Sequence, residues 1–315
     1  MRPARTLAEA LTQGAVVLDG GLSNQLVAQG CDLSDELWSA RLLADDPRQI
    51  GTAHTAYVRA GARVLTTASY QATFEGFARR GLGRQEAGRL LATSVQLARA
   101  AGELQELRSA VGRAESLGDD IWVAASVGPY GAFLADGSEY RGRYGLSVRE
   151  LERFHRPRIE ALVAAEPDVL ALETVPDIDE AEALLRAVEG CGVPVWLSYS
   201  IEGGRTRAGQ DLAEAFGLVA GRDQVIATGV NCCTPADAGR AVPLAASVSG
   251  KPVVVYPNSG ERWDAEHRRW TGDVTFDAAR IEEWTASGAR LVGGCCRVGP
   301  SGISELSARI RTAQA

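Results

Sequence analysis

Residues 168–198 read DVLALETVPDIDEAEALLRAVEGCGVPVWLS and contain two short apolar runs, 168–172 and 193–198, on either side of an amphipathic segment. Both runs lack regular apolar–polar alternation, which is typical of strands that are covered on both faces. The segment between them carries a capping pair, one apolar stripe and a terminating glycine: Asp177 with Glu180; Ile178, Ala181, Leu185 and Val188; and Gly190. The stretch therefore predicts a strand, a helix and a second, parallel strand.

Six further runs of this kind are predicted to be strands: 15–19, 63–67, 121–126, 225–230, 252–256 and 290–292. Eight strands alternating with helices over about 290 residues is the pattern of a (β/α)8 TIM barrel, and a doubly wound open sheet is the alternative fold. Because the sequence has no internal repeat and no Pro- or Ser-rich linker, we expect a single domain over residues 1–315. We interpret the charged stretch 103–120 as a solvated insertion. The barrel's active site is expected at the C-terminal face of the strands.

The composition excludes several classes of partner. The chain has 33 basic and 40 acidic side chains, a formal net charge of −7, so neither nucleic acid nor an anionic membrane is an expected partner. No apolar run approaches the ~18–20 residues of a membrane span. The run 15–18 (AVVL) is too short for the core of a signal peptide. We therefore expect a soluble, cytoplasmic protein that acts on small molecules, and no segment indicates its oligomeric state.

Four of the six cysteines occur as two adjacent pairs, and each pair directly follows a predicted strand. Cys232 and Cys233 follow the sixth strand, and Cys295 and Cys296 follow the eighth. In a barrel both pairs lie at one rim, with strand ends roughly 10 Å apart because neighbouring strands are ~4.8 Å apart. Zinc takes thiolate ligands at ~2.3 Å, and three of them leave a fourth position open for a substrate. The two pairs therefore predict a metal site.

The spacing does not decide which three of the four thiols bind. Chance core residues and a disulfide are the alternatives, and a disulfide is disfavoured in the reducing cytoplasm. Thr234 and Pro235 are typical of a helix start, and its positive end is expected to lower the pKa of the thiols just before it. Cys31 and Cys191 stand alone and are interpreted as structural thiols.

From about Val16 to Pro300 the chain resembles the zinc-dependent homocysteine S-methyltransferases, most closely the cobalamin-independent enzymes that use S-methylmethionine or S-adenosylmethionine. Nine segments carry the resemblance: 18–21 (LDGG), 37–40 (LWSA), 67–73 (TASYQAT), 126–131 (SVGPYG), 136–140 (DGSEY), 172–174 (LET), 229–232 (GVNC), 255–261 (VYPNSGE) and 293–296 (GGCC). It implies an enzyme that transfers a methyl group from a sulfonium donor to the zinc-bound thiolate of L-homocysteine, giving L-methionine.

The resemblance also implies roles for individual residues. It selects Cys232, Cys295 and Cys296 as the ligands of Zn²⁺. Asp19 and Glu173 match carboxylates that hold the amino group of homocysteine. The remaining predicted substrate contacts are Tyr70, which matches a tyrosine able to occupy the fourth metal position before substrate arrives, and Asn231, which precedes Cys232.

The chain departs from the family pattern at 23–27, where it reads SNQLV and many members read roughly ATELE. Two carboxylates are therefore missing near the amino-acid pocket. Three alternative functions stay open: a betaine-type methyl donor in the same family, a retaining glycosidase that uses Glu173 and Glu261, and a non-catalytic zinc-binding module.

Overall fold

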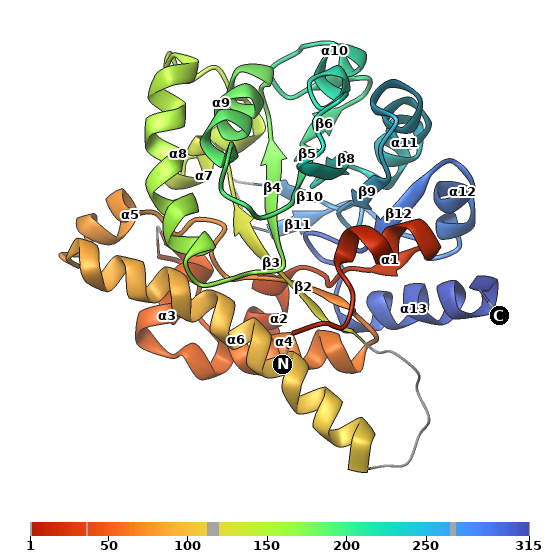
Figure 1. The fold of residues 1–315 in the computed structure, drawn as a ribbon, viewed down its shortest axis with the longest axis horizontal. Helices are drawn as coiled ribbons and strands as arrows, with labels where there is room; N and C mark the ends of the chain where they lie inside the picture. Colours follow the sequence, from red (N-terminus) through yellow and green to blue (C-terminus); the bar gives the residue numbers. More distant parts are fainter. Residues whose placement is uncertain (1, 36, 112–119, 265–268, 315) are drawn as a thin grey trace.

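Eight parallel strands form the central sheet of the computed structural model, which describes residues 2–35, 37–111, 120–264 and 269–314 (Figure 1). All eight predicted strands are present: β1 (Val16–Val17), β2 (Val64–Thr66), β3 (Trp122–Val127), β4 (Val169–Val175), β5 (Val195–Tyr199), β8 (Val225–Asn231), β9 (Val253–Tyr256) and β12 (Ala289–Val292). Two short antiparallel hairpins, β6 (Ile201–Glu202) with β7 (Arg205–Thr206) and β10 (Arg262–Asp264) with β11 (Arg269–Thr271), lie in the loops after β5 and β9.

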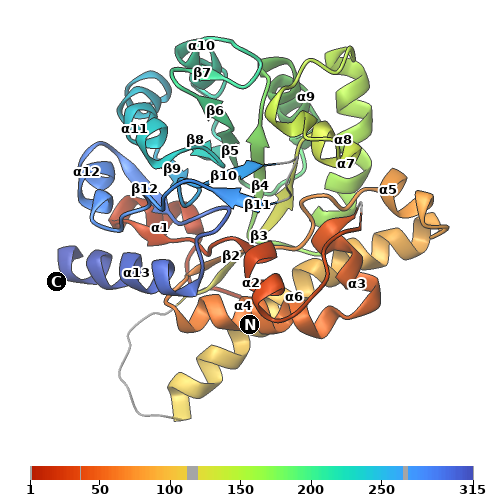
Figure 2. The same ribbon diagram turned by 180° about the vertical axis from the view of Figure 1, so that it is seen from behind.

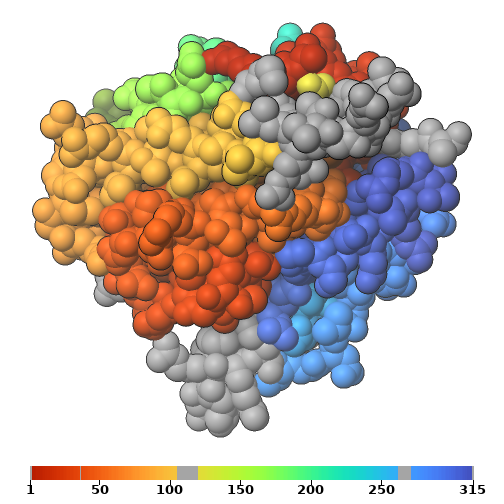
Figure 3. Space-filling view, turned by 90° about the horizontal axis from the view of Figure 1, so that it is seen from below, coloured from red at the N-terminus to blue at the C-terminus, as the bar shows by residue number. Residues whose placement is uncertain are grey.

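The strands close into a ring. Their order is β1-β12-β9-β8-β5-β4-β3-β2, and the two end strands are joined by a parallel bridge between Leu18 and Val64. On either side of this bridge the N–H of Asp19 donates to the carbonyl of Val64 at 3.0 Å and the N–H of Arg63 donates to that of Val17 at 2.8 Å. Figure 3 shows the N-terminal (red and orange) and C-terminal (blue) segments meeting on one face. The (β/α)8 barrel is confirmed, and the open-sheet alternative is wrong.

Helices surround the strands in both views (Figures 1 and 2). The described helices are α1 (Leu7–Gln13), α2 (Leu22–Ala28), η1 (Trp38–Arg41), α3 (Leu42–Asp45), α4 (Pro47–Arg59), α5 (Phe74–Arg79), α6 (Arg84–Val111), α7 (Tyr130–Leu134), η2 (Ser138–Tyr140), α8 (Val148–Val163), α9 (Ile178–Val188), α10 (Leu212–Gly217), α11 (Pro235–Ser249), α12 (Arg280–Ala286) and α13 (Pro300–Gln314). In the described part of the chain, none of them is long and apolar enough to cross a bilayer.

The side chains of each strand alternate between two apolar cores. On β4, Val169 and Ala171 belong to the core inside the barrel, whereas Leu170 and Leu172 belong to the core between the strands and the outer helices. All seven residues of β4 are buried, which explains why its sequence shows no apolar–polar alternation.

Helix α1 closes the N-terminal end of the barrel and was not predicted from the sequence. Leu7 and Leu11 pack with the inward-facing strand residues, and the indole N–H of Trp122 donates to the carbonyl of Arg5 at 2.9 Å. The N–H of Ala4 donates to Asp120, just before β3, at 2.6 Å. Because this end is filled, the open part of the barrel is the opposite face.

Two local predictions were wrong. The chain over 103–111 continues helix α6 rather than forming a solvated insertion, and 112–119 lies outside the described residues. Asp177 caps α9 by accepting from the N–H of Asp179 at 3.0 Å, but Glu180 does not return the bond. Glu180 is fully buried and accepts from His155 and Tyr144 at 2.9 and 3.2 Å, because it faces the loop after β3.

We predict that Gly229→Ala destabilises the protein. A Cβ at Gly229 in β8 would overlap the carbonyl oxygen of Val254 in β9, so the two strands must move apart at a cost of about 1–3 kcal/mol. Gly88→Ala is the matched control, because open space surrounds that position in α6 and alanine there stabilises the helix by up to ~1 kcal/mol. Urea denaturation measures both, and equal midpoints would contradict the packing of β8 on β9.

Candidate active site

A pocket of about 770 Å³, part of it open to solvent, lies at the C-terminal ends of the strands. Six of the seven predicted site residues line it: Asp19, Tyr70, Glu173, Cys232, Cys295 and Cys296. They come from segments that follow or end β1, β2, β4, β8 and β12. Barrel closure therefore brings together side chains that are up to 277 residues apart in the sequence (19 to 296).

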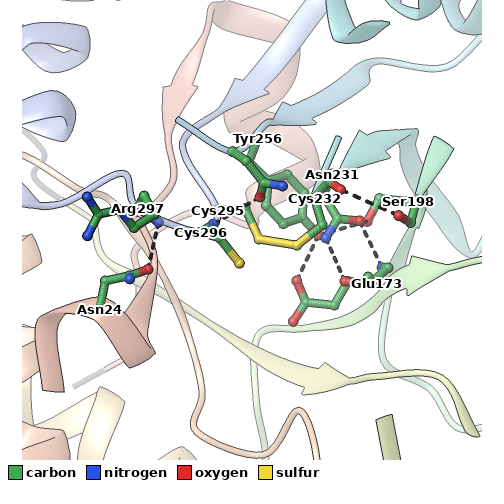
Figure 4. The surroundings of a disulfide bond; sticks show 12 residues. Asn24, Glu173, Ser198, Asn231, Cys232, Tyr256, Cys295, Cys296 and Arg297 are labelled. Atoms are coloured by element: carbon green, nitrogen blue, oxygen red, sulfur yellow. Dashed lines mark hydrogen bonds between the residues drawn. A yellow bond between two sulfur atoms is a disulfide. The ribbon is translucent and has the colours of Figure 1, made fainter. Parts of the chain in front are cut away.

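Three cysteine sulfurs converge in this pocket. The sulfurs of Cys232, Cys295 and Cys296 all lie within 4.8 Å of one another. Cys232 and Cys295, whose Cα atoms are 5.6 Å apart, form a disulfide in the structure (Figure 4). From the sequence we expected reduced thiols, because a disulfide is disfavoured in a reducing cytoplasm, and this pairing corrects that expectation. Because the disulfide occupies two of the three sulfurs, it and a three-thiolate metal site exclude each other.

The reduced triad fits a tetrahedral metal ion. Ligands at ~2.3 Å in a tetrahedron are about 3.8 Å apart, so three sulfurs that all lie within 4.8 Å of one another can share one ion once the bond between Cys232 and Cys295 is reduced. Burial and the nearby carboxylates of Glu139 and Glu173 raise the pKa of Cys296 to about 11, so without a cation this thiol keeps its proton. A divalent ion reverses that balance by stabilising the thiolate.

Cys233 points away from the triad. It is 1% exposed, belongs to the outer core, and burial raises its pKa to about 12. Thr234 does cap helix α11, accepting from the N–H of Asp237 at 3.1 Å, as predicted. The expected lowering of the Cys233 pKa by the helix end is wrong, because desolvation outweighs the helix dipole at this position.

Neighbouring elements fix the backbone of the last two cysteines. The N–H of Cys295 donates to the carbonyl of Pro257 at 2.8 Å, and that of Cys296 donates to Asn258 Oδ1 at 3.1 Å. The next N–H, of Arg297, donates to Asn24 Oδ1 at 2.6 Å (Figure 4). The two thiols are therefore positioned by groups from β9's loop and from α2.

Asn24 belongs to the segment in which this chain departs from the family pattern. It lines the pocket, and its side chain supports the turn after the last cysteine, where Arg297 has a φ of +68°. A left-handed backbone costs a non-glycine residue of order 1–3 kcal/mol and requires such support. The segment 23–27 thus places an amide beside the turn that follows the last two cysteines.

Two buried carboxylates also line the pocket. Asp19 accepts from the N–H and the hydroxyl of Thr66 at 2.7 and 3.0 Å. Glu173 accepts from the hydroxyls of Ser126 and, at 2.9 Å, Tyr256. Burial raises the pKa of both, that of Asp19 to about 8 with a further contribution from Glu173. Since no Lys, Arg or His is among the described lining residues, this pair suits a cationic ligand.

Asn231 is the predicted site residue that does not line the pocket. It is fully buried, and its amide oxygen accepts from the N–H of Thr174 at 2.8 Å and from Ser198 at 2.9 Å. Its amide nitrogen donates to the Thr174 hydroxyl at 2.7 Å. Thr174 has a φ of +59°, which is unusual for a β-branched residue. Asn231 therefore holds the strained residue that follows Glu173.

Sequence reasoning missed three residues that shape the pocket, although all lie in the matching segments. Tyr256, at the end of β9, bonds to Glu173 and Ser198. Glu139 and Tyr140, in η2, line the pocket beside Cys296. Their positions after strand ends were a usable signal, but the contacts depend on loop geometry that periodicity does not encode.

Comparison with known proteins supports the geometry. The family model described as "Homocysteine S-methyltransferase" matches residues 16–310. The chain is 42% identical over 309 residues to homocysteine S-methyltransferase YbgG of Bacillus subtilis, covering 96% of both chains. It is 42% identical to homocysteine S-methyltransferase of Escherichia coli, covering 98% of both. The chain belongs to the homocysteine S-methyltransferase family.

Solved structures of the family share the fold. The metallated form of the Escherichia coli homocysteine methyltransferase MmuM superposes with a TM-score of 0.84 at 41% identity, covering 96% of this chain and 99% of that one. Its oxidized form gives the same TM-score and identity. As a member of this enzyme family, the protein acts on homocysteine and a methyl donor, and its cysteine triad can hold a metal.

We predict that Asp19 makes the ligand-free protein less stable at higher pH. Its pKa is about 8 in the folded protein against 3.8 ordinarily, so between these values the folded state binds the proton more tightly. Its contribution is complete below pH 3.8 and is lost as the pH rises through about 8. From about pH 5 to about pH 9 the unfolding free energy of the wild type should fall relative to Asp19→Asn.

Urea denaturation over this pH series measures the difference. Asp179→Asn, which removes an exposed carboxylate from the first turn of α9, is the control and should follow the wild type. Parallel curves for wild type and Asp19→Asn would contradict the buried, high-pKa carboxyl.

Proposed function

We propose that this protein transfers a methyl group from a sulfonium donor to the sulfur of L-homocysteine, giving L-methionine, with Zn²⁺ as the metal. One observation carries the proposal: three cysteine sulfurs within 4.8 Å of one another share a pocket with two buried carboxylates that have no basic side chain among the described lining. Homocysteine carries a thiol and an ammonium group. The cysteine triad with its metal would bind the thiol, and the two carboxylates would bind the ammonium group.

Cys232, Cys295 and Cys296 would hold the zinc. When bound, zinc ionises the thiol of homocysteine, whose pKa near 8.5 leaves it mostly protonated at pH 7; removing this shortfall is worth roughly 2 kcal/mol. The chain keeps Cys295 and Cys296 in place through the backbone bonds to Pro257 and Asn258.

Asp19 and Glu173 would bind the ammonium group of homocysteine. Each keeps acceptor capacity beyond its bonds to the protein, because a carboxylate accepts about four hydrogen bonds. Asn231 positions Glu173 through Thr174. Binding homocysteine at both its ammonium group and its thiol would fix the position of its sulfur. The main requirement of the transfer is that this sulfur, the methyl carbon and the donor sulfur lie in line.

The transfer needs no general acid. The bond between the methyl carbon and the donor sulfur breaks while a bond to the homocysteine sulfur forms, and the donor leaves as a neutral thioether. Tyr70 lies at the pocket wall with its ring against Gly128, where a Cβ would stand 2.7 Å from the ring carbons. We propose that Tyr70 shields the metal position until homocysteine enters.

S-methylmethionine is the donor we favour over S-adenosylmethionine and a betaine, on the resemblance to the small enzymes that use it. The glycosidase alternative is not supported, since Glu261 pairs with Arg297 through two bonds of 3.0 Å and does not line the pocket. A non-catalytic zinc module is disfavoured, because it requires a fourth protein ligand and the described cluster has three.

The setting follows from the chemistry. Three reduced thiols require a reducing compartment, so we propose that the protein works in the cytoplasm as a single domain over residues 1–315. A net charge of −7 supports small-molecule substrates rather than nucleic acid.

We predict that the zinc-loaded protein forms methionine from homocysteine and S-methylmethionine. Cys232→Ala should lose both the zinc and the turnover, whereas Cys233→Ala, one residue away and buried in the outer core, should keep both. Metal analysis and amino-acid chromatography measure the outcome, with S-adenosylmethionine and glycine betaine as alternative donors. Methionine formation by metal-free Cys232→Ala would contradict the proposed role of the triad.

We predict that Glu173→Gln raises the KM for homocysteine at least about tenfold, because a charge-assisted hydrogen bond contributes about 1.5–3 kcal/mol. Bound zinc and the KM for the donor should stay near wild-type values. Steady-state kinetics with each substrate varied, together with metal analysis, tests this; release of zinc by Glu173→Gln would mean that the carboxylate supports the metal instead.

A further inference from the structure

A third acidic side chain lines the pocket and is not used by the proposed reaction. Glu139 lies in η2, in the loop after β3, and its Oε2 is buried without a hydrogen-bond partner in the described part of the chain. A buried carboxylate oxygen without a partner costs free energy, and ligand binding is one way in which a protein recovers it.

The position of Glu139 is fixed by its own loop. A Cβ at Gly131 in α7 would overlap the N–H of Glu139, so η2 lies directly on α7. Gly137 precedes η2 with a φ of +82°, and Asp136 accepts from the N–H of Ser138 at 2.9 Å. The carboxylate is therefore held at the wall by a supported turn.

Glu139 comes from a different part of the wall than the carboxylate pair: it lies in η2 next to Tyr140, whereas Glu173 lies in β4 and bonds to Ser126 and Tyr256. Asp19 instead bonds to the N–H and hydroxyl of Thr66 in β2. The pocket thus presents a pair of carboxylates for one ammonium group and a separate carboxylate for another positive charge.

The change in charge of each group during the reaction indicates which positive charge Glu139 would bind. A sulfonium loses its charge in the transfer, so a carboxylate beside it would stabilise the ground state more than the transition state and would slow the reaction. An ammonium group keeps its charge throughout, so binding it is neutral to the chemical step. Trp38, also in the lining, is a neutral aromatic side chain of the kind that suits the sulfonium.

We propose that Glu139 binds the α-ammonium group of the methyl donor, so that the enzyme recognises its donor as an amino acid. This inference rests on the proposed function. It assigns Glu139 to donor binding and leaves homocysteine to Asp19 and Glu173.

The test compares two donors that differ in one group: S-methylmethionine and 4-(dimethylsulfonio)butanoate, which lacks the α-amino group. Glu139→Gln should lower kcat/KM for S-methylmethionine by about tenfold to a hundredfold, mostly through KM, because a charge-assisted bond is lost. The value for the deaminated donor and the KM for homocysteine should stay within about twofold. Glu214→Gln, an exposed glutamate in the first turn of α10, removes the same charge and should change neither.

A second variant guards against misfolding of the first. Glu139→Asp keeps the charge but shortens the side chain, so it should give a smaller loss that again affects only the amino-acid donor. Equal losses with both donors would overturn the inference and show a structural role, and unchanged kinetics would overturn it as well. Failure of the wild type to methylate homocysteine from any donor would instead overturn the proposed function on which it rests.

Discussion

The site depends on one constraint: sulfurs from two separate strand ends must meet at a single point. Cys232 follows β8 and Cys295 follows β12, with β9 between these strands in the sheet. Both residues reach the same pocket because the barrel is curved and its strand ends share one rim. A flat sheet would hold the two ends roughly 10 Å apart, too far for shared coordination. The curvature that produces the inner core therefore also brings the three sulfurs together.

The close packing of the strands explains why a glycine, Gly293, lies just before Cys295 and Cys296. Gly293 has no room for a Cβ because Leu18 and Asp19 of the neighbouring segment lie 2.5 and 2.6 Å from where it would be. Positive φ angles at Thr174 and Cys232 store strain at two other strand ends. Asn231 offsets part of the strain at Thr174 with two hydrogen bonds. This role explains why the Asn231 side chain is buried and does not line the pocket.

Most of the fold could be predicted from the sequence, because eight apolar runs such as that in β4 record burial on both faces. The grouping of the cysteines at one rim followed from strand order alone. Helix α1 was missed because it is short: the capping box of Thr6 and Glu9 begins a helix of only seven residues. The charged end of α6 was misread because a run of charged residues is compatible with a helix as well as with a loop. The disulfide and the raised pKa of Cys233 depend on distances and burial that no spacing rule encodes.

The order of the three triad cysteines along the chain has a consequence for biosynthesis. Two of the three triad sulfurs lie at positions 295 and 296 of 315, and the strand before them pairs with β1 to complete the ring. A nascent chain emerging from the ribosome can therefore fold much of its barrel while lacking two of the three sulfurs. Binding of a metal by all three sulfurs would become possible only after the last strand has docked, so a bound ion would report that the ring has closed.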